Sequence, residues 1–107
     1  MASDKPTCPA EITIALVAGR WKLMVILRLL TRTHRFNELQ RDLGRITHRT
    51  LARTLKEMEE DGLVRRKDYG EVPPRVEYSL TEKGITLEPI LVEMERWAEA
   101  SAAQHHQ

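Results

Sequence analysis

Apolar residues recur along the chain at helical spacing, and capping residues mark where the helices begin and end. The segment Trp21–Thr31 is apolar nearly all round, so we expect it to be the buried centre of the domain. Thr47 is a suitable N-cap for a helix that runs to about Asp61, and Gly62 stands where a left-handed C-cap is needed. The pattern predicts helices over residues 9–18, 21–31, 36–43 and 48–61.

The last two of these helices are joined by a short turn that contains Gly44, which is typical of a helix-turn-helix unit at about residues 36–61. After Gly62 the pattern changes to alternation and predicts strands over Leu63–Lys67 and Val76–Leu80. Two strands alone are marginally stable, so this hairpin must pack on the helices. The predicted fold is mainly α with a small β-hairpin, a wing, at about residues 63–80.

Thr81 is expected to cap a last helix at about residues 82–98, with a bend in its first half at Pro89. The apolar stripe of this helix is larger than a small core needs, which predicts a dimer interface. The stripe consists of Leu87, Ile90, Leu91, Met94 and Trp97. The alternative is that it packs entirely on its own chain. Residues 1–7 and 99–107 are expected to be flexible tails.

The chain has 107 residues, enough for one domain at about residues 8–98 and too few for a Rossmann domain or a TIM barrel. Hydrophobic residues make up 41% and charged residues 31%, as in globular proteins. The longest unbroken apolar run, Leu23–Leu27, is too short to cross a membrane, and the first residues do not form a secretory signal. A single cysteine excludes an internal disulfide, so a cytoplasmic location is expected.

The net charge of +1 conceals an uneven distribution. Residues 20–67 carry thirteen bases and six acids, a net charge of +7, whereas residues 81–107 carry a net charge of −3. In the helix at 48–61, the bases lie opposite the apolar face and the acids are confined to the C-terminal half. This order opposes the helix dipole, but it suits a helix whose N-terminal half meets a polyanion. We therefore predict that this helix recognises nucleic acid, the alternative being a merely solvated face.

The candidate DNA-binding residues fall into two groups. Arg49, Thr50 and Arg53, with His48 beside them, are predicted to contact base edges. The predicted phosphate contacts are Lys56, Arg35, Lys67 and Arg75. Glu71 opposes a DNA contact at the wing tip, so a plain surface turn is the alternative there.

Several motifs in this sequence strongly resemble the HxlR family of bacterial winged helix-turn-helix transcription regulators. The motifs are Cys8-Pro9, Gly19-Arg20-Trp21-Lys22, Arg35-Phe36-Asn37-Glu38-Leu39, Asp61-Gly62-Leu63-Val64 and Val72-Pro73-Pro74-Arg75-Val76-Glu77-Tyr78-Ser79-Leu80-Thr81. The resemblance implies a homodimer formed by the outer N- and C-terminal helices. It also implies that the helix at 48–61 enters the major groove while the wing touches the flanking backbone or minor groove. The expected function is that of a regulator on a palindromic operator; the rival interpretation is a winged-helix module that binds an acidic protein surface.

Cys8 lies at the start of the first predicted helix, where the dipole stabilises a thiolate. The resemblance implies that the matching cysteine can sense oxidants or small electrophiles. With one cysteine per chain, the routes left open are a Cys8–Cys8 bridge between subunits, a mixed disulfide or alkylation. A half-buried thiol with no signalling role is the alternative.

No pattern in the sequence indicates an enzyme, a cofactor or a metal site. His34 and His48 are isolated, Cys8 has no partner at ligand spacing, and His105-His106 falls in a predicted tail. There is no glycine-rich phosphate loop and no nucleophile elbow. The expected partners are double-stranded DNA, a second copy of the chain and, through Cys8, an oxidant or electrophile.

Overall fold

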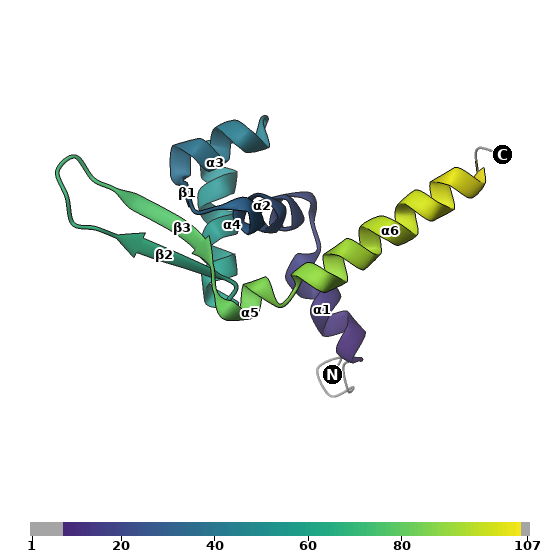
Figure 1. Cartoon of the computed structure of the whole chain (residues 1–107). Helices are drawn as coiled ribbons and strands as arrows, with labels where there is room; N and C mark the ends of the chain where they lie inside the picture. Colours follow the sequence, from purple (N-terminus) through teal and green to yellow (C-terminus); the bar gives the residue numbers. More distant parts are fainter. Residues whose placement is uncertain (1–7, 106–107) are drawn as a thin grey trace.

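The computed structural model describes residues 8–105, with six helices and a three-stranded sheet in that part of the chain (Figure 1). The helices are α1 (Pro9–Val17), α2 (Arg20–Thr31), α3 (Phe36–Leu43), α4 (His48–Glu60), α5 (Glu82–Ile85) and α6 (Glu88–His105). The strands are β1 (His34–Arg35), β2 (Val64–Asp68) and β3 (Val76–Leu80). This arrangement confirms the predicted winged helix-turn-helix fold, mainly α with a small hairpin.

Helix α2 lies at the centre of the domain, as its sequence predicts. Val25, Ile26 and Leu29 are buried, and most of its other apolar residues pack against the same core. The helix contacts α1, α3, α4 and β3, so no side of it is left wholly to solvent. An apolar surface all round a helix is stable only in such a position.

The two ends of α4 are fixed by the predicted caps. The Thr47 hydroxyl accepts a hydrogen bond from the backbone N–H of Thr50 at 3.1 Å. At the other end, the N–H groups of Gly62 and Leu63 donate to the carbonyls of Glu59 and Met58. Gly62 has a φ of 77°, and this left-handed cap turns the chain from α4 into β2.

The sheet contains one strand more than the sequence pattern predicts. All three strands are antiparallel in the order β1-β3-β2, so β2 is an outer strand of this sheet. His34 pairs with Tyr78, and Tyr78 pairs with Arg66 on the other side. Strand β1 has only two residues, too few for an alternating pattern to be visible in the sequence.

The prediction of one bent helix after Thr81 is wrong, because the structure has two helices separated at Thr86-Leu87. In a continuous helix the ring of Pro89 would clash with the carbonyl of Ile85, and Pro89 has no N–H to donate. The chain therefore ends α5 at Ile85 and begins α6 with Pro89 in its first turn, where proline is tolerated. Helix α6 continues to His105, so the tail expected from residue 99 is helical that far; residues 1–7 lie outside the described residues.

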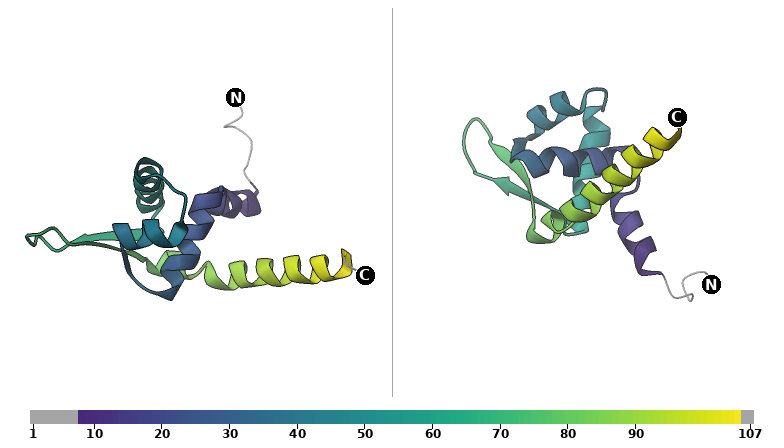
Figure 2. Two further views of the ribbon diagram at one scale, coloured as in Figure 1. Left: turned by 90° about the horizontal axis from the view of Figure 1, so that it is seen from above. Right: turned by 45° about the vertical axis from the view of Figure 1, so that its right-hand side comes forward.

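Helix α6 and the wing extend from opposite sides of the helical body (Figures 1 and 2). The radius of gyration is 16.2 Å, against about 13 Å for a compact chain of this size. No helix within residues 8–105 has both the length and the apolar character needed to cross a membrane.

Candidate nucleic-acid interface

Helix α4 has one face in the core and the opposite face in solvent. Leu51, Leu55 and Met58 are buried, whereas the predicted contact residues His48, Arg49, Arg53 and Lys56 are exposed. Thr50 is half-buried, and its hydroxyl accepts a hydrogen bond from the Thr47 hydroxyl at 2.9 Å. Among the described residues, no acid lies within 4.0 Å of Arg49, Arg53 or Lys56 to neutralise their charge.

Local contacts hold α4 against α3 and fix the turn between them. The Gln40 side-chain amide donates to the Ile46 carbonyl at 3.2 Å across the turn. The rings of Phe36 and His48 lie 4.5 Å apart between centroids, so His48 is anchored at the start of α4. The exposed face of α4 is thereby positioned by core and turn contacts rather than by its own charged residues.

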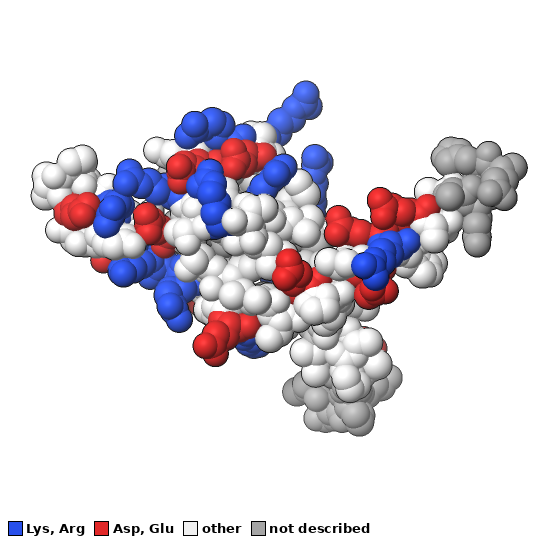
Figure 3. Space-filling view, in the orientation of Figure 1, with Lys and Arg blue, Asp and Glu red and all other residues white. Residues whose placement is uncertain are grey.

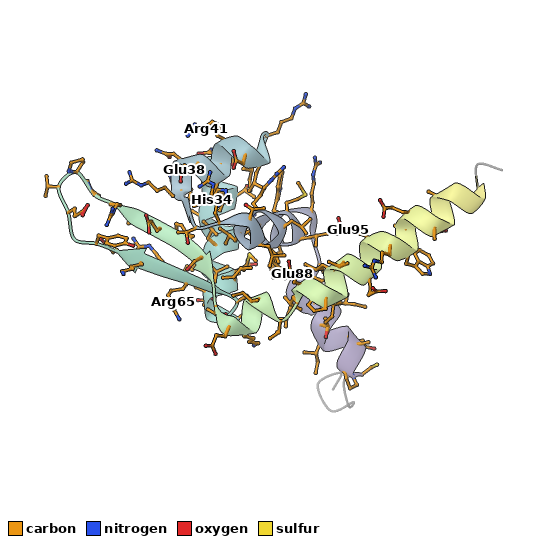
Figure 4. The ribbon with its side chains drawn as sticks, viewed as in Figure 1. His34, Glu38, Arg41, Arg65, Glu88 and Glu95 are labelled. Carbon is orange, nitrogen blue, oxygen red and sulfur yellow. The ribbon has the colours of Figure 1, made fainter. Side chains whose placement is uncertain are left out.

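Arg35 lies at the N-cap of α3, on the same side of the molecule as the wing. Its backbone N–H donates to the Glu38 carboxylate at 2.8 Å. This hydrogen bond, with a smaller contribution from the Arg32 guanidinium, lowers the pKa of Glu38 below its ordinary value. Figure 4 shows Glu38 and Arg41 on α3 close to His34, with Arg65 on the wing. The Arg35 side chain is exposed.

The wing is organised around Tyr69. The ring centroid lies 3.7 Å from Cζ of Arg75 and 4.6 Å from Nζ of Lys67. The Tyr69 hydroxyl donates to Glu77 at 2.7 Å, which raises the pKa of the phenol. Nε of Arg75 lies 3.4 Å from Glu71 and Arg75 is half-buried, whereas Lys67 is exposed.

The strand register brings two predicted phosphate contacts to one face of the sheet. Arg35 pairs with Glu77 on β3, and Glu77 pairs with Lys67 on β2. Residues paired directly across antiparallel strands project from the same face. Arg35 and Lys67 therefore flank Glu77 in a row that no sequence pattern reveals, because β1 is too short to predict.

Basic side chains gather over the helix-turn-helix and the wing, whereas α6 carries mostly acidic ones (Figure 3). The surface that would meet a polyanion is therefore separated from the outer helices. The basic part of the surface has further exposed arginines that the sequence pattern does not assign to a role, among them Arg20, Arg45, Arg65 and Arg66. The sequence shows that residues 20–67 carry an excess of positive charge, but it does not show which of these arginines lie on the same face as the exposed side of α4.

The residues predicted for a dimer interface divide into two groups. Leu87 and Leu91 are 6% and 3% exposed and belong to the protomer's own core, so a substitution at Leu91 would test folding rather than assembly. Ile90, Met94 and Trp97 are 44%, 50% and 74% exposed. Helix α1 has no buried residue, and its Ile12 and Ile14 are also exposed.

Cys8 is exposed, not half-buried, and lies at the N-cap of α1. His34 is buried, with Nδ1 3.0 Å from the Arg32 carbonyl and Nε2 3.1 Å from Asp42, so it links β1 to α3. No group of three metal-ligating side chains occurs in the described part of the chain. His106 lies outside it.

A basic helix exposed on a helix-turn-helix, with a hairpin beside it, defines the winged helix-turn-helix class of DNA-binding proteins. The chain belongs to the HxlR family, because the profile of the HxlR-like helix-turn-helix family matches residues 16–106. It is 45% identical over 98 residues to the uncharacterized HTH-type transcriptional regulator YybR of Bacillus subtilis, covering 92% of this chain and 78% of YybR. It is 54% identical over 91 residues to the uncharacterized regulator BH0655 of Halalkalibacterium halodurans, covering 83% of this chain and 80% of the relative. The protein is thus a helix-turn-helix transcriptional regulator, and its relatives are regulators rather than enzymes.

Solved structures show the same fold. The chain superimposes on the redox regulator HypR in its reduced form with a TM-score of 0.83 and 44% sequence identity. The match covers 89% of this chain and 94% of HypR. The oxidized form of HypR has a TM-score of 0.79 at 46% identity, over 87% of this chain and 96% of HypR. The reduced form of YodB from B. subtilis has a TM-score of 0.80 at 36% identity, over 88% of this chain and 93% of YodB.

Proposed function

We propose that this regulator binds a palindromic operator as a homodimer, with α4 of each protomer in the major groove. The exposed basic face of α4, which no acid of residues 8–105 neutralises, is the observation that carries this proposal. Arg49, Thr50 and Arg53, with His48 beside them, contact base edges. Lys56, Arg35 and Lys67 contact phosphates, and Arg75 joins them once a phosphate replaces Glu71. Half-sites lie about 10 bp apart or a multiple of that.

The proposal is tested by a salt titration of the unmodified chain on a random-sequence DNA duplex. A DNA-binding protein releases counterions, so the logarithm of its association constant falls steeply and linearly with the logarithm of salt concentration. A winged-helix module that binds an acidic protein surface would have little affinity for the duplex at any salt concentration. That outcome would overturn the proposal.

Substitution of Lys67 by glutamine is expected to weaken binding to all DNA sequences alike and to reduce the salt slope by about one unit. The reason is that Lys67 lies on the exposed face of the sheet, in register with Glu77 and Arg35. Fluorescence anisotropy at several salt concentrations measures both quantities. The matched control is Lys83→Gln on α5, where the amine donates to the Asp61 carbonyl. Equal slopes for the two variants would contradict the assignment.

We propose that α1 and α6 form the subunit interface, supported by the exposed apolar residues Ile12, Ile14, Ile90, Met94 and Trp97. Apolar grooves on either side of Leu91 and Met94 extend this surface, one against α1 and one against α2. A surface of this kind is typical of an interface.

Trp97→Glu is expected to lower the mass in solution toward the 12.4 kDa of one chain. Trp97 is 74% exposed, so the charge should leave the protomer folded. Light scattering measures the mass, and Arg96→Gln, which makes the same change in net charge on the same helix, is the control. A Trp97→Glu protein that keeps the mass of a dimer would refute the interface.

We further propose that Cys8 makes DNA binding responsive to oxidants or electrophiles. The thiol is exposed at the start of α1, next to the proposed interface, and the structural relatives include HypR, named as a redox regulator, and a diamide-treated form of YodB. Diamide is expected to change DNA affinity of the unmodified chain and to leave Cys8→Ser unaffected. If both proteins respond alike, Cys8 is not the sensor.

A further inference from the structure

A groove of about 320 Å³ separates the start of α2 from the middle of α4. Residues 18–22 line one side of it, and Thr50, Arg53 and Glu57 line the other. The side formed by residues 18–22 includes the motif Gly19-Arg20-Trp21-Lys22, which has no part in the proposed function. The side formed by α4 includes Thr50 and Arg53, which the proposed function places against base edges.

Three basic residues line the groove, namely Arg20, Lys22 and Arg53. They differ in whether a nearby acid compensates their charge. Nζ of Lys22 lies 3.4 Å from Glu57, so this pair ties α2 to α4 and is largely neutral. Arg20 is exposed, and none of the acids in the described range lies within 4.0 Å of it. Its Cζ lies 5.0 Å from the ring centroid of Trp21. An arginine held on an aromatic ring keeps its N–H groups free for a planar or tetrahedral anion.

Helix α2, like α4, begins with basic residues and has no acid in its first turn. The first turn of α2 holds Arg20 and Lys22 and no acid, an order that the helix dipole disfavours. The cost is offset if an anion occupies the groove between the two helices. The phosphates of a DNA strand border the major groove, so a strand beside Thr50 and Arg53 would pass the mouth of this groove.

We infer that this groove binds a backbone phosphate of the DNA strand beside α4, with Arg20 as the charged donor. The inference rests on the proposed function, since it requires α4 to lie in the major groove. A phosphate contact carries no sequence information, so Arg20 fixes the depth and angle of α4 rather than the choice of bases.

The test is a salt titration of Arg20→Gln on a random-sequence duplex, measured by fluorescence anisotropy beside the unmodified chain. The loss of one phosphate contact reduces the slope by about 0.9, and affinity should fall by the same factor on duplexes of different sequence. Lys22→Gln should change the slope less, because Glu57 already compensates that charge. Arg96→Gln, with the same charge change on α6, should leave the slope unaltered.

The outcomes separate this inference from the function on which it rests. If the unmodified chain has no salt-dependent affinity for the duplex, the proposed function fails and the inference fails with it. If the unmodified chain binds but Arg20→Gln keeps the full slope, only the inference is overturned. A lower thermal midpoint for Arg20→Gln with an unchanged slope would show that Arg20 only packs on Trp21, and would also overturn it.

Discussion

Replacement of Arg53 by alanine is expected to weaken operator binding by about 1–3 kcal/mol, or roughly 5- to 150-fold in Kd. Arg53 is exposed on the outer face of α4, and the guanidinium can donate two parallel hydrogen bonds to guanine, which alanine cannot replace. The operator is first obtained by selection from a random DNA pool, and affinities are then measured on the operator and on a random duplex. The variant should lose more affinity for the operator than for the random duplex, and its own selection should be relaxed at one position.

The control for this experiment is Lys56→Ala, which removes a base from the same exposed face of α4. We assign Lys56 to a phosphate, so its loss should weaken both duplexes by the same factor. An Arg53→Ala protein that also loses the same factor on both duplexes would refute the base contact and assign Arg53 to the backbone instead. The fold is not at issue in either variant, because both side chains lie outside the core.

Gly84→Ala is expected to lower the free energy of unfolding by about 1–3 kcal/mol, as overpacked core substitutions do. Helix propensity alone predicts the opposite sign, since alanine in a helix is favoured over glycine by roughly 0.5–1 kcal/mol. A Cβ at this position would clash with the backbone oxygen of Leu63 and would lie 3.2 Å from Cδ2 of Leu80. The backbone of Leu63 cannot yield easily, because its carbonyl accepts the hydrogen bond from the Thr81 N–H at 3.0 Å.

Urea denaturation measures this difference, and Glu82→Ala in the same short helix is the control. Glu82 is exposed in the first turn of α5, so its loss should cost less than about 1 kcal/mol through the helix dipole. A Gly84→Ala protein as stable as the unmodified chain would show that α5 can move away from Leu63. The close approach of α5 to the start of β2 would then not be required for stability.

Local sequence signals predict the parts of the fold that depend on contacts between residues three or four positions apart. Thr47 and Gly62 fix α4 because a hydroxyl cap and a left-handed glycine act over three or four residues. Pro89 indicates that a regular helix is interrupted there, but a proline can either bend a helix or stand in the first turn of a new one. In the structure a new helix begins, and Leu87, at the junction of α5 and α6, is buried in the core.

The sequence pattern does not show which residues of an apolar stripe are buried or which side chains contact one another, because both depend on tertiary contacts. The apolar spacing in the last helix shows one stripe of five residues. Only the packing against α1 and α2 shows that Leu87 and Leu91 are buried while the other three residues are exposed. The candidate DNA residues on α4 were predicted because burial of Leu51, Leu55 and Met58 determines which side faces solvent. The contact of Arg75 with Tyr69 depends on the pairing of the hairpin, in which the Tyr69 N–H donates to the Arg75 carbonyl, and Glu71 lies four residues before Arg75.

The position of β2 at the border of the sheet has a consequence for the behaviour of the protein at high concentration. An edge strand has unpaired backbone N–H and C=O groups that can pair with another extended chain, and such pairing leads to aggregation. Arg65, Arg66 and Lys67 follow one another on this strand. If the β2 edges of two molecules approached each other, these cations would lie close together on adjacent strands and would repel. The side chains of this strand therefore keep neighbouring molecules from joining their sheets.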